Sequence, residues 1–331
     1  MVSLPVGKTT YPVSRETKWR HRFTILTAVV TVLLLAWGGV VTSINAGMAF
    51  PDWPTSLGSY NWLNPVDRWW ANPAYLAEHG HRILGSVTGL LTLTLAVWTW
   101  QTDPRAWMRW LGGVAVLLVV AQGVLGGLRV VFVSTDLAMV HACVAQLFFA
   151  LLVSMALFTS EGWLQASSQL APTSRLPGLR RATLATVCAL YVQIVLGALL
   201  RHQGGGTDPL YVGLHVTGAC LVIGFVGVTG AIALKHFWGK ALIRRGVLAT
   251  AGAVALQFVL GFSAYLVLVY ESAAARRSFL QVALNSAHLV VGAILMAAAL
   301  SLTLLVWRPA QSLARSASNG SSSLQPASAA S

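Results

Sequence analysis

Charged residues are scarce in this chain, and acidic residues are the scarcest. Only 9% of its 331 residues are charged, with nine Asp or Glu against 22 Lys or Arg, whereas 56% are hydrophobic. Soluble domains carry about 25% charged residues, so a soluble protein is excluded. A net charge of +13 would suggest nucleic-acid binding in a soluble protein, but no nucleic-acid partner is expected here. The composition predicts a protein that crosses a lipid bilayer several times.

Cysteine is also rare. The three cysteines, Cys143, Cys188 and Cys220, all lie inside apolar runs, where they cannot form a disulfide in an aqueous loop. No CxxC and no Cys/His zinc spacing occurs. A disulfide-stapled or zinc-bound domain is therefore excluded.

Eight apolar runs follow a basic N-terminal tail, and each is near the roughly 20 residues that a spanning helix requires. They predict an all-α, polytopic membrane protein with helices at 23–44, 80–100, 107–129, 137–158, 181–202, 212–235, 247–270 and 285–307. Lys and Arg concentrate in the two tails and in alternate loops. By the positive-inside rule, both termini are expected in the cytoplasm, with the chain in the cell's inner (plasma) membrane.

The chain carries an internal repeat. Gln-x-Val-Leu-Gly begins at Gln122, Gln193 and Gln257, in the third, fifth and seventh predicted helices. Glutamine and glycine also serve ordinary helix packing in membranes, but the regular recurrence favours two pseudo-symmetric four-helix bundles. The expected organisation is a basic tail (1–22), an N-terminal unit (23–158), a cytoplasmic linker (159–180), a C-terminal unit (181–307) and a disordered tail (308–331).

Four histidines open the even-numbered predicted helices, at the same depth on the outer side. His81, His141, His215 and His288 are each followed four residues later by a glycine or alanine, which lies one turn away on the same face. Ionisable residues within a membrane are rare and normally functional, and paired imidazoles from facing helices commonly hold haem. A mononuclear metal would need further ligands, and a proton relay would need acids in mid-membrane. The pattern therefore favours haem ligation.

Glu78 lies three residues before His81, on nearly the same helical face. It is interpreted as a general acid/base or charge stabiliser, although a carboxylate near a helix N-terminus also favours the helix dipole. Arg82, Arg129 and Arg201 lie on the side that is poor in basic residues. They are candidates for binding haem propionates, with snorkelling to lipid headgroups as the alternative.

The remaining histidines, His21, His79, His202 and His236, are expected to be solvated. The first outer segment, 45–79, is long and rich in Trp and Pro. It predicts either an interfacial aromatic belt or a cap over an outward-facing pocket.

Over residues 23–307 the chain resembles the heme A synthase family. The resemblance rests on the four histidines together with six motifs: Glu78-x-x-His81-Arg82, Gly38-Gly39-Val40-Val41-Thr42, Asp52-Trp53-Pro54, Gln122-Gly123-x-Leu125-Gly126-Gly127, His215-x-x-Gly218-Ala219 and Asn285-x-x-His288.

This resemblance implies oxidation of a haem O methyl group to the formyl group of haem A by successive hydroxylations. It implies that His81 and His141 hold the substrate haem beside Glu78, and that His215 and His288 hold a permanent haem b. Haem O synthase, an electron donor and a second copy of the chain are the partners considered.

Two features depart from the family. Segments 45–79 and 203–211 lack the cysteine pair that many bacterial members carry, and the stretch from Thr42 to Gly47 lacks an arginine common there. A di-haem electron-transfer protein linked to quinone is the main rival, because it would share every histidine. A transporter built from repeats is the rival from another class.

Overall fold

The protein is described here by a computed structural model, which describes residues 14–165, 173–271 and 278–308. Eight of its helices are long and apolar enough to cross a membrane, which confirms the predicted all-α membrane fold. They are α1 (Arg15–Ser43), α2 (Pro73–Thr102), α3 (Ala106–Val131), α4 (Thr135–Thr159), α6 (Leu176–His202), α7 (Pro209–Phe237), α8 (Ala241–Tyr270) and α9 (Phe279–Trp307). The expected disordered tail falls almost wholly outside the described residues.

Capping side chains set several helix starts earlier than the apolar runs predicted. The Asn72 side chain accepts from Ala74 N at 3.0 Å and Pro73 fills the first turn of α2, so α2 begins seven residues before the predicted position 80. Ser14 caps α1 in the same way through Thr17 N. Such caps satisfy backbone N–H groups that the helix itself leaves unpaired.

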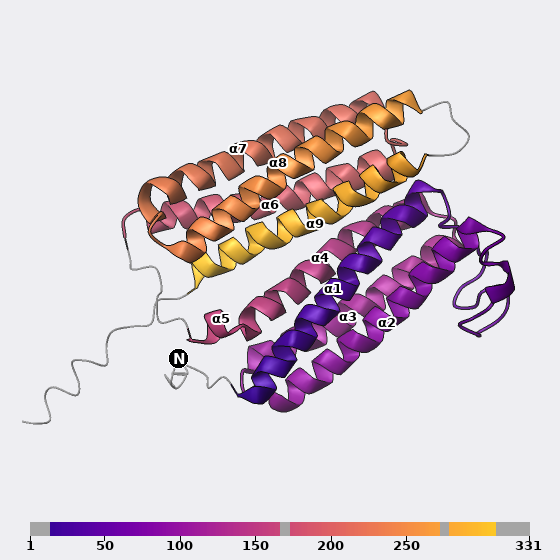
Figure 1. Ribbon diagram of the computed structural model, residues 1–331, viewed down its shortest axis with the longest axis horizontal. Helices are drawn as coiled ribbons and strands as arrows, with labels where there is room; N and C mark the ends of the chain where they lie inside the picture. The colour runs from indigo at the N-terminus through magenta and orange to yellow at the C-terminus, as the bar shows by residue number, and fades with distance from the viewer. Residues whose placement is uncertain (1–13, 166–172, 272–277, 309–331) are drawn as a thin grey trace, which may run out of the picture.

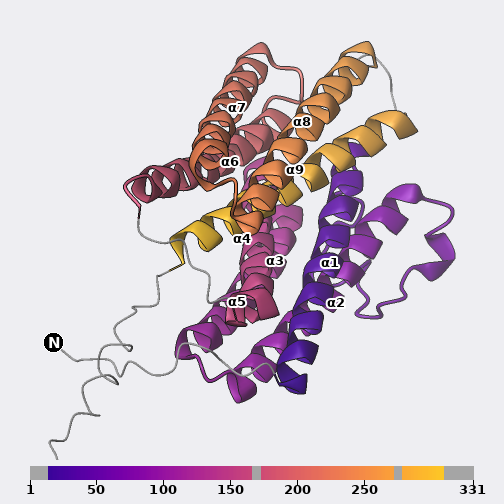
Figure 2. The same ribbon diagram turned by 60° about the vertical axis from the view of Figure 1, so that its left-hand side comes forward.

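The helices form two four-helix bundles (Figure 1). In the first, α1 packs on α2 and α4, and α3 packs on α2 and α4; in the second, α6, α7, α8 and α9 repeat the same neighbour relations. The bundles meet where α1 and α4 pack against α9, with α4 also against α6, as the turned view of Figure 2 shows. The short helix α5 (Glu161–Gln165) was not expected and lies in the linker.

The N-terminal bundle has an apolar core toward the end at which α2 finishes and α3 begins. Leu95, Met108, Leu152 and Met155 are almost completely buried there. The start of α1 and the end of α9 lie at the end of the molecule opposite the long loop between α1 and α2 (Figure 1). This arrangement is the one expected of an even number of spanning helices. The side of the membrane on which the termini lie stays a prediction.

Candidate haem-binding site

The four predicted histidines form two pairs, one in each bundle. His81 of α2 faces His141 of α4, with ring centroids 6.5 Å apart and ring planes at 72°. His215 of α7 faces His288 of α9, with centroids 6.3 Å apart and planes at 69°. The two pairs occupy equivalent places in the two bundles, because α2 and α4 correspond to α7 and α9 in the order of packing.

Each histidine ring lies against a glycine of the neighbouring helix. A Cβ atom added at each glycine would lie close to Cε1 of its histidine. The distance is 3.2 Å for Gly38 and His81, 3.3 Å for Gly126 and His141, 3.0 Å for Gly197 and His215, and 2.7 Å for Gly261 and His288. We call these four residues the contact glycines. A Cβ at Gly261 would force His288 to move, and a Cβ at the other three glycines would press on the ring by a few tenths of an ångström, so glycine lets each imidazole approach the adjacent helix closely. The glycine of the Gln-x-Val-Leu-Gly repeat therefore makes room for a histidine.

The glutamine of the same repeat contacts the same histidine. Gln122 Nε2 donates to the backbone oxygen of His141 at 3.1 Å, and Gln193 Nε2 donates to that of His215 at 2.9 Å. Gln193 Nε2 also lies 3.1 Å from Nδ1 of His215, and Gln257 Nε2 lies 3.2 Å from Nε2 of His288. The sequence showed this recurrence, but its purpose required the three-dimensional contacts.

The residues at both pairs fit a haem. Two metal–nitrogen bonds of about 2.0–2.1 Å each, together with the two ring radii, separate ring centroids by roughly 6 Å, close to the observed spacings. Nδ1 of His81, His141 and His288 is buried with no hydrogen-bond partner among the described residues. Buried polar atoms are rarely left unpaired. We therefore expect these three imidazole rings to contact a bound group.

Glu78 lies one turn before His81 and is 3% exposed. Its Oε1 forms an ion pair with Nη2 of Arg82 at 2.7 Å, and its Oε2 accepts from the backbone N–H of Phe50 at 3.0 Å. One carboxylate oxygen thus contacts the next turn of α2, and the other contacts the loop. The carboxylate joins the start of α2 to the loop between α1 and α2, next to the first histidine pair.

That loop, residues 44–72, folds onto the end of the N-terminal bundle at which α2 begins. Arg82 donates to the backbone oxygens of Thr55 at 2.8 Å and Asp52 at 3.0 Å. Phe50 is fully buried, and the Trp53 ring covers Gly127 of α3. The loop is therefore a cap on the bundle, while Tyr60, Trp62 and Trp70 are exposed on its outside, as in an aromatic belt.

Asp52 explains why the Asp52-Trp53-Pro54 motif holds its shape. Its carboxylate accepts from Thr55 Oγ1 at 2.5 Å and from the N–H groups of Leu57 and Gly58. Burial alone would raise the pKa of Asp52, but these hydrogen bonds outweigh it and hold the pKa below the ordinary value. The ionised carboxylate thus stabilises the turn that follows the cap's tryptophan.

The prediction that His79 is solvated was wrong. The side chain is 4% exposed, its Nδ1 lies 3.2 Å from Ser56 Oγ, and its Nε2 contacts the backbone oxygen of Trp62. It holds the cap, which sequence reasoning could not foresee without knowing where the loop folds. Of the others expected to be solvated, His236 is exposed and His21 and His202 are half-buried.

The other two candidate arginines lie near the junction of cap and bundles. Arg129 donates to the backbone oxygen of Gly47 at 3.1 Å and lies within electrostatic reach of Glu78. Arg201 of α6 reaches Ser43 Oγ of α1 at 3.4 Å, across the interface between bundles. Their role toward haem propionates stays a prediction.

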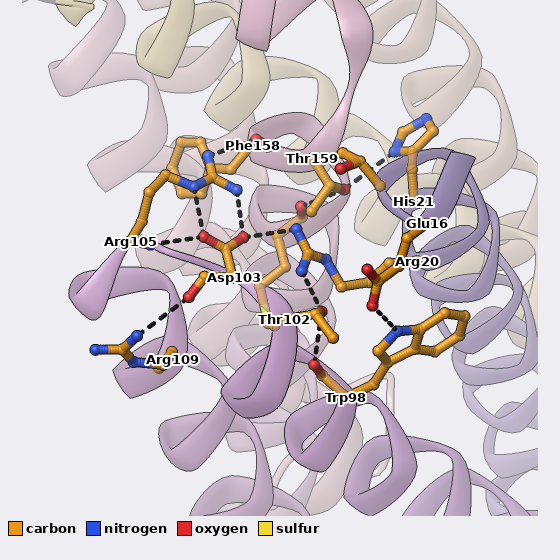
Figure 3. A network of polar contacts seen from close by, with 12 residues as sticks. Glu16, Arg20, His21, Trp98, Thr102, Asp103, Arg105, Arg109, Phe158 and Thr159 are labelled. Carbon is orange, nitrogen blue, oxygen red and sulfur yellow. Dashed lines mark hydrogen bonds and ion pairs between the residues drawn. The ribbon is translucent and has the colours of Figure 1, made fainter. Parts of the chain in front are cut away.

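A buried ion cluster at the opposite end was missed (Figure 3). Asp103 accepts from Arg20 Nη2 at 2.8 Å and from Arg105 Nη2 at 2.7 Å, and all three side chains are almost completely buried. Arg105 also donates to the backbone oxygen of Phe158 at 2.8 Å. The cluster ties α1, the α2–α3 turn and α4 together. Arg20 lies within the predicted basic tail, and its partner Asp103 is 83 residues away in the sequence.

Comparison with known proteins assigns the fold to a family. Residues 21–212 match the COX15-CtaA family, described as cytochrome oxidase assembly protein. This match covers the N-terminal bundle and ends before His215. Heme A synthase of Symbiobacterium thermophilum is 31% identical over 180 residues, or 53% of this chain and 56% of that protein.

Two further relatives bear the same name. Heme A synthase of Shouchella clausii is 27% identical over 188 residues, which are 56% of this chain and 60% of that protein. Heme A synthase of Bacillus pumilus is 24% identical over 259 residues, which are 72% of this chain and 82% of that protein. The chain thus spans less than two thirds of the length of the first two relatives. Since the family match covers more than half of the sequence, the chain belongs to the COX15-CtaA family of cytochrome oxidase assembly proteins.

Proposed function

We propose that this protein is a heme A synthase, an oxidoreductase that converts haem O to haem A by oxidising one ring methyl to a formyl group. The observation that carries the proposal is the pairing of four histidines into two equivalent sites, with ring centroids 6.5 and 6.3 Å apart. Relatives named heme A synthase support it. The reaction proceeds by successive hydroxylations of the same carbon.

The two sites take different roles because their surroundings differ. Glu78 and Arg82 lie beside His81 under the cap, so the N-terminal pair, His81 and His141, binds the substrate haem O. The C-terminal pair, His215 and His288, holds haem b, which supplies electron transfer when bound. An external donor provides the electrons, and haem O synthase supplies the substrate.

The chain's own residues bind, orient and shield the substrate. The contact glycines fix each imidazole against a neighbouring helix, and the cap with Phe50 and Trp53 excludes water from the outer end of the bundle. Glu78 holds negative charge next to the reacting ring, where it stabilises positive charge that develops at the oxidised carbon or accepts its proton. Arg82, Arg129 and Arg201 are placed at the outer end to pair with propionates.

The location follows from the same assignment. The protein is a multi-pass membrane protein, placed in the plasma membrane with both termini in the cytoplasm by the positive-inside rule. Both histidine pairs then lie toward the outer face, and the cap is on the outside. Homo-oligomers are compatible with this arrangement.

The test is an optical and mass analysis of haems extracted from the purified protein, expressed with and without a haem O supply. Haem A or its hydroxylated intermediate, found only with haem O and alongside constant haem b, is the expected result. Two haem b per chain, unchanged by haem O, would establish the rival di-haem electron-transfer protein instead. A protein without haem would overturn both.

A further inference from the structure

Three of the four contact glycines are preceded by a glutamine at the fourth position upstream. These pairs are Gln122 with Gly126, Gln193 with Gly197, and Gln257 with Gly261. Residues four apart share one helical face, so glutamine and glycine meet the same histidine. The observed contacts of the three amides with His141, His215 and His288 agree with this spacing.

His81 alone has no such amide. Its contact glycine, Gly38, is preceded at the fourth position by Leu34, and its Nδ1 has no partner in the described part of the chain. One turn beyond His81, a Cβ at Gly85 would meet no described atom within 4 Å. At the corresponding place beyond His288, the Gln257 amide nitrogen lies 3.1 Å from a Cβ added at Gly292.

The three amides have the chemistry to orient a metal-bound imidazole. A histidine that binds a metal through one ring nitrogen donates its other ring N–H to an acceptor, which fixes the ring and makes it a better ligand. Oε1 of Gln193 and Gln257 is buried without a partner among the described residues, as is Nδ1 of His141 and His288. For Gln257 and His288 the unused oxygen and the unused ring nitrogen belong to the same contact, so a rotation of the Gln257 amide would turn an acceptor toward the ring.

We propose that Gln122, Gln193 and Gln257 are positioning residues for His141, His215 and His288, and that His81 is the least constrained of the four haem ligands. The inference deepens the proposed function and rests on it for the assignment of the substrate haem to the His81 pair. It places the exchangeable iron ligand beside Glu78, in the site where the substrate reacts.

Ligand exchange at this site involves no change of oxidation state. With a haem bound, exchange would release Nε2 of His81, which would keep its lone pair, and an external ligand would supply the replacing lone pair. With both histidines of a pair bound to the metal, cyanide could bind only where one of them has left. The rate at which cyanide binds the oxidised haem therefore reports how readily a histidine leaves.

The first experiment adds the missing amide and removes one that is present. Leu34→Gln is expected to slow cyanide binding to the N-terminal haem by on the order of tenfold, since losing or gaining such a partner typically changes metal affinity by about 10–100-fold. Gln122→Leu is expected to speed it. The control is Gln146→Leu, because Gln146 is buried on α4 with no hydrogen bond to a histidine among the described residues, and it should bind cyanide at the parent rate.

The second experiment measures the midpoint potential of each haem by optical redox titration. Gln193→Leu and Gln257→Leu are expected to raise the potential of the C-terminal haem, because an imidazole without an acceptor donates less charge to ferric iron. The N-terminal haem should keep its potential. These two variants preserve the test if Leu34→Gln fails to fold.

The outcomes separate this inference from the proposed function. Haem-loaded variants with unchanged cyanide rates and unchanged potentials would overturn the positioning role, leaving the glutamines as packing residues. Shifted rates and potentials in a protein that never converts haem O would uphold the positioning role and overturn the synthase activity.

Discussion

Replacing a contact glycine by alanine should displace a histidine by a predictable amount. At Gly261 the new Cβ would lie 2.7 Å from Cε1 and 3.1 Å from Nδ1 of His288. Carbon atoms pack favourably at about 3.5–4.0 Å, so the ring must retreat by roughly 1 Å. The backbone of α8 cannot give way as easily, because it is part of a continuous helix.

A displacement of that size is incompatible with metal ligation. Metal–ligand distances tolerate about ±0.2 Å, so His288 cannot follow an iron held by His215 without a new ring orientation. Gly261→Ala is therefore expected to lower haem b content at least tenfold at limiting haem. The graded contacts predict that Gly197→Ala, whose Cβ would lie 3.0 Å from Cε1 of His215, lowers haem b content less than Gly261→Ala does.

The assay is haem b per chain in purified protein, measured by pyridine haemochrome absorbance and protein mass. Gly252→Ala is the matched control: it lies on the same helix, and a Cβ there meets no described atom within 4 Å. Alanine is also favoured over glycine in helices by about 1 kcal/mol, so this control should be at least as stable as the parent. Full haem b content in Gly261→Ala, with an unchanged spectrum, would refute the reasoning.

Three further changes probe other parts of the molecule. Glu78→Gln is expected to keep both haems but lower haem A formation by about 10²–10⁴-fold, measured on extracted haems; full activity would remove Glu78 from the mechanism. Gly127→Ala should push Trp53 off α3 and expose the cap to limited proteolysis, whereas Gly123→Ala, with open space around it, should not. Asp103→Ala should destabilise the protein by about 3–5 kcal/mol, because it removes the carboxylate that two buried arginines share, measured by chemical unfolding in detergent. Burial alone would raise the pKa of Asp103, but the Arg105 hydrogen bonds and charge outweigh it and lower the pKa. The contribution of Asp103 to the stability of the folded protein is therefore present above about pH 4, and it is lost as the pH falls through the folded-state pKa.

Hydropathy and local spacing were sufficient to predict the helices and the histidines. Apolar runs of spanning length leave the backbone no alternative to helix in lipid, and the N-terminal parts of α2 and α4 carry histidines that meet. The helix starts were placed too late, because caps such as Asn72 and Ser14 extend the helices into polar sequence that hydropathy does not register. The recurring Gln-x-Val-Leu-Gly indicated equivalent sites without revealing what each residue contacts.

Long-range polar contacts could not be predicted. Arg20 falls in the predicted basic tail, but its partner Asp103 follows α2 and is brought near only when the bundle assembles. His79 looked like a boundary residue, but the loop between α1 and α2 folds back over it. In both cases the deciding neighbour is distant in sequence, and a local pattern carries no information about it.

The central claim is that each bundle holds one haem between its own pair of histidines. The most direct test is the identity and amount of haem in His288→Ala and His81→Ala variants of protein supplied with haem O. The account predicts that His288→Ala loses haem b and still takes up haem O, and that His81→Ala retains haem b and fails to hold haem O. Loss of haem b from His81→Ala together with its retention in His288→Ala would contradict the account.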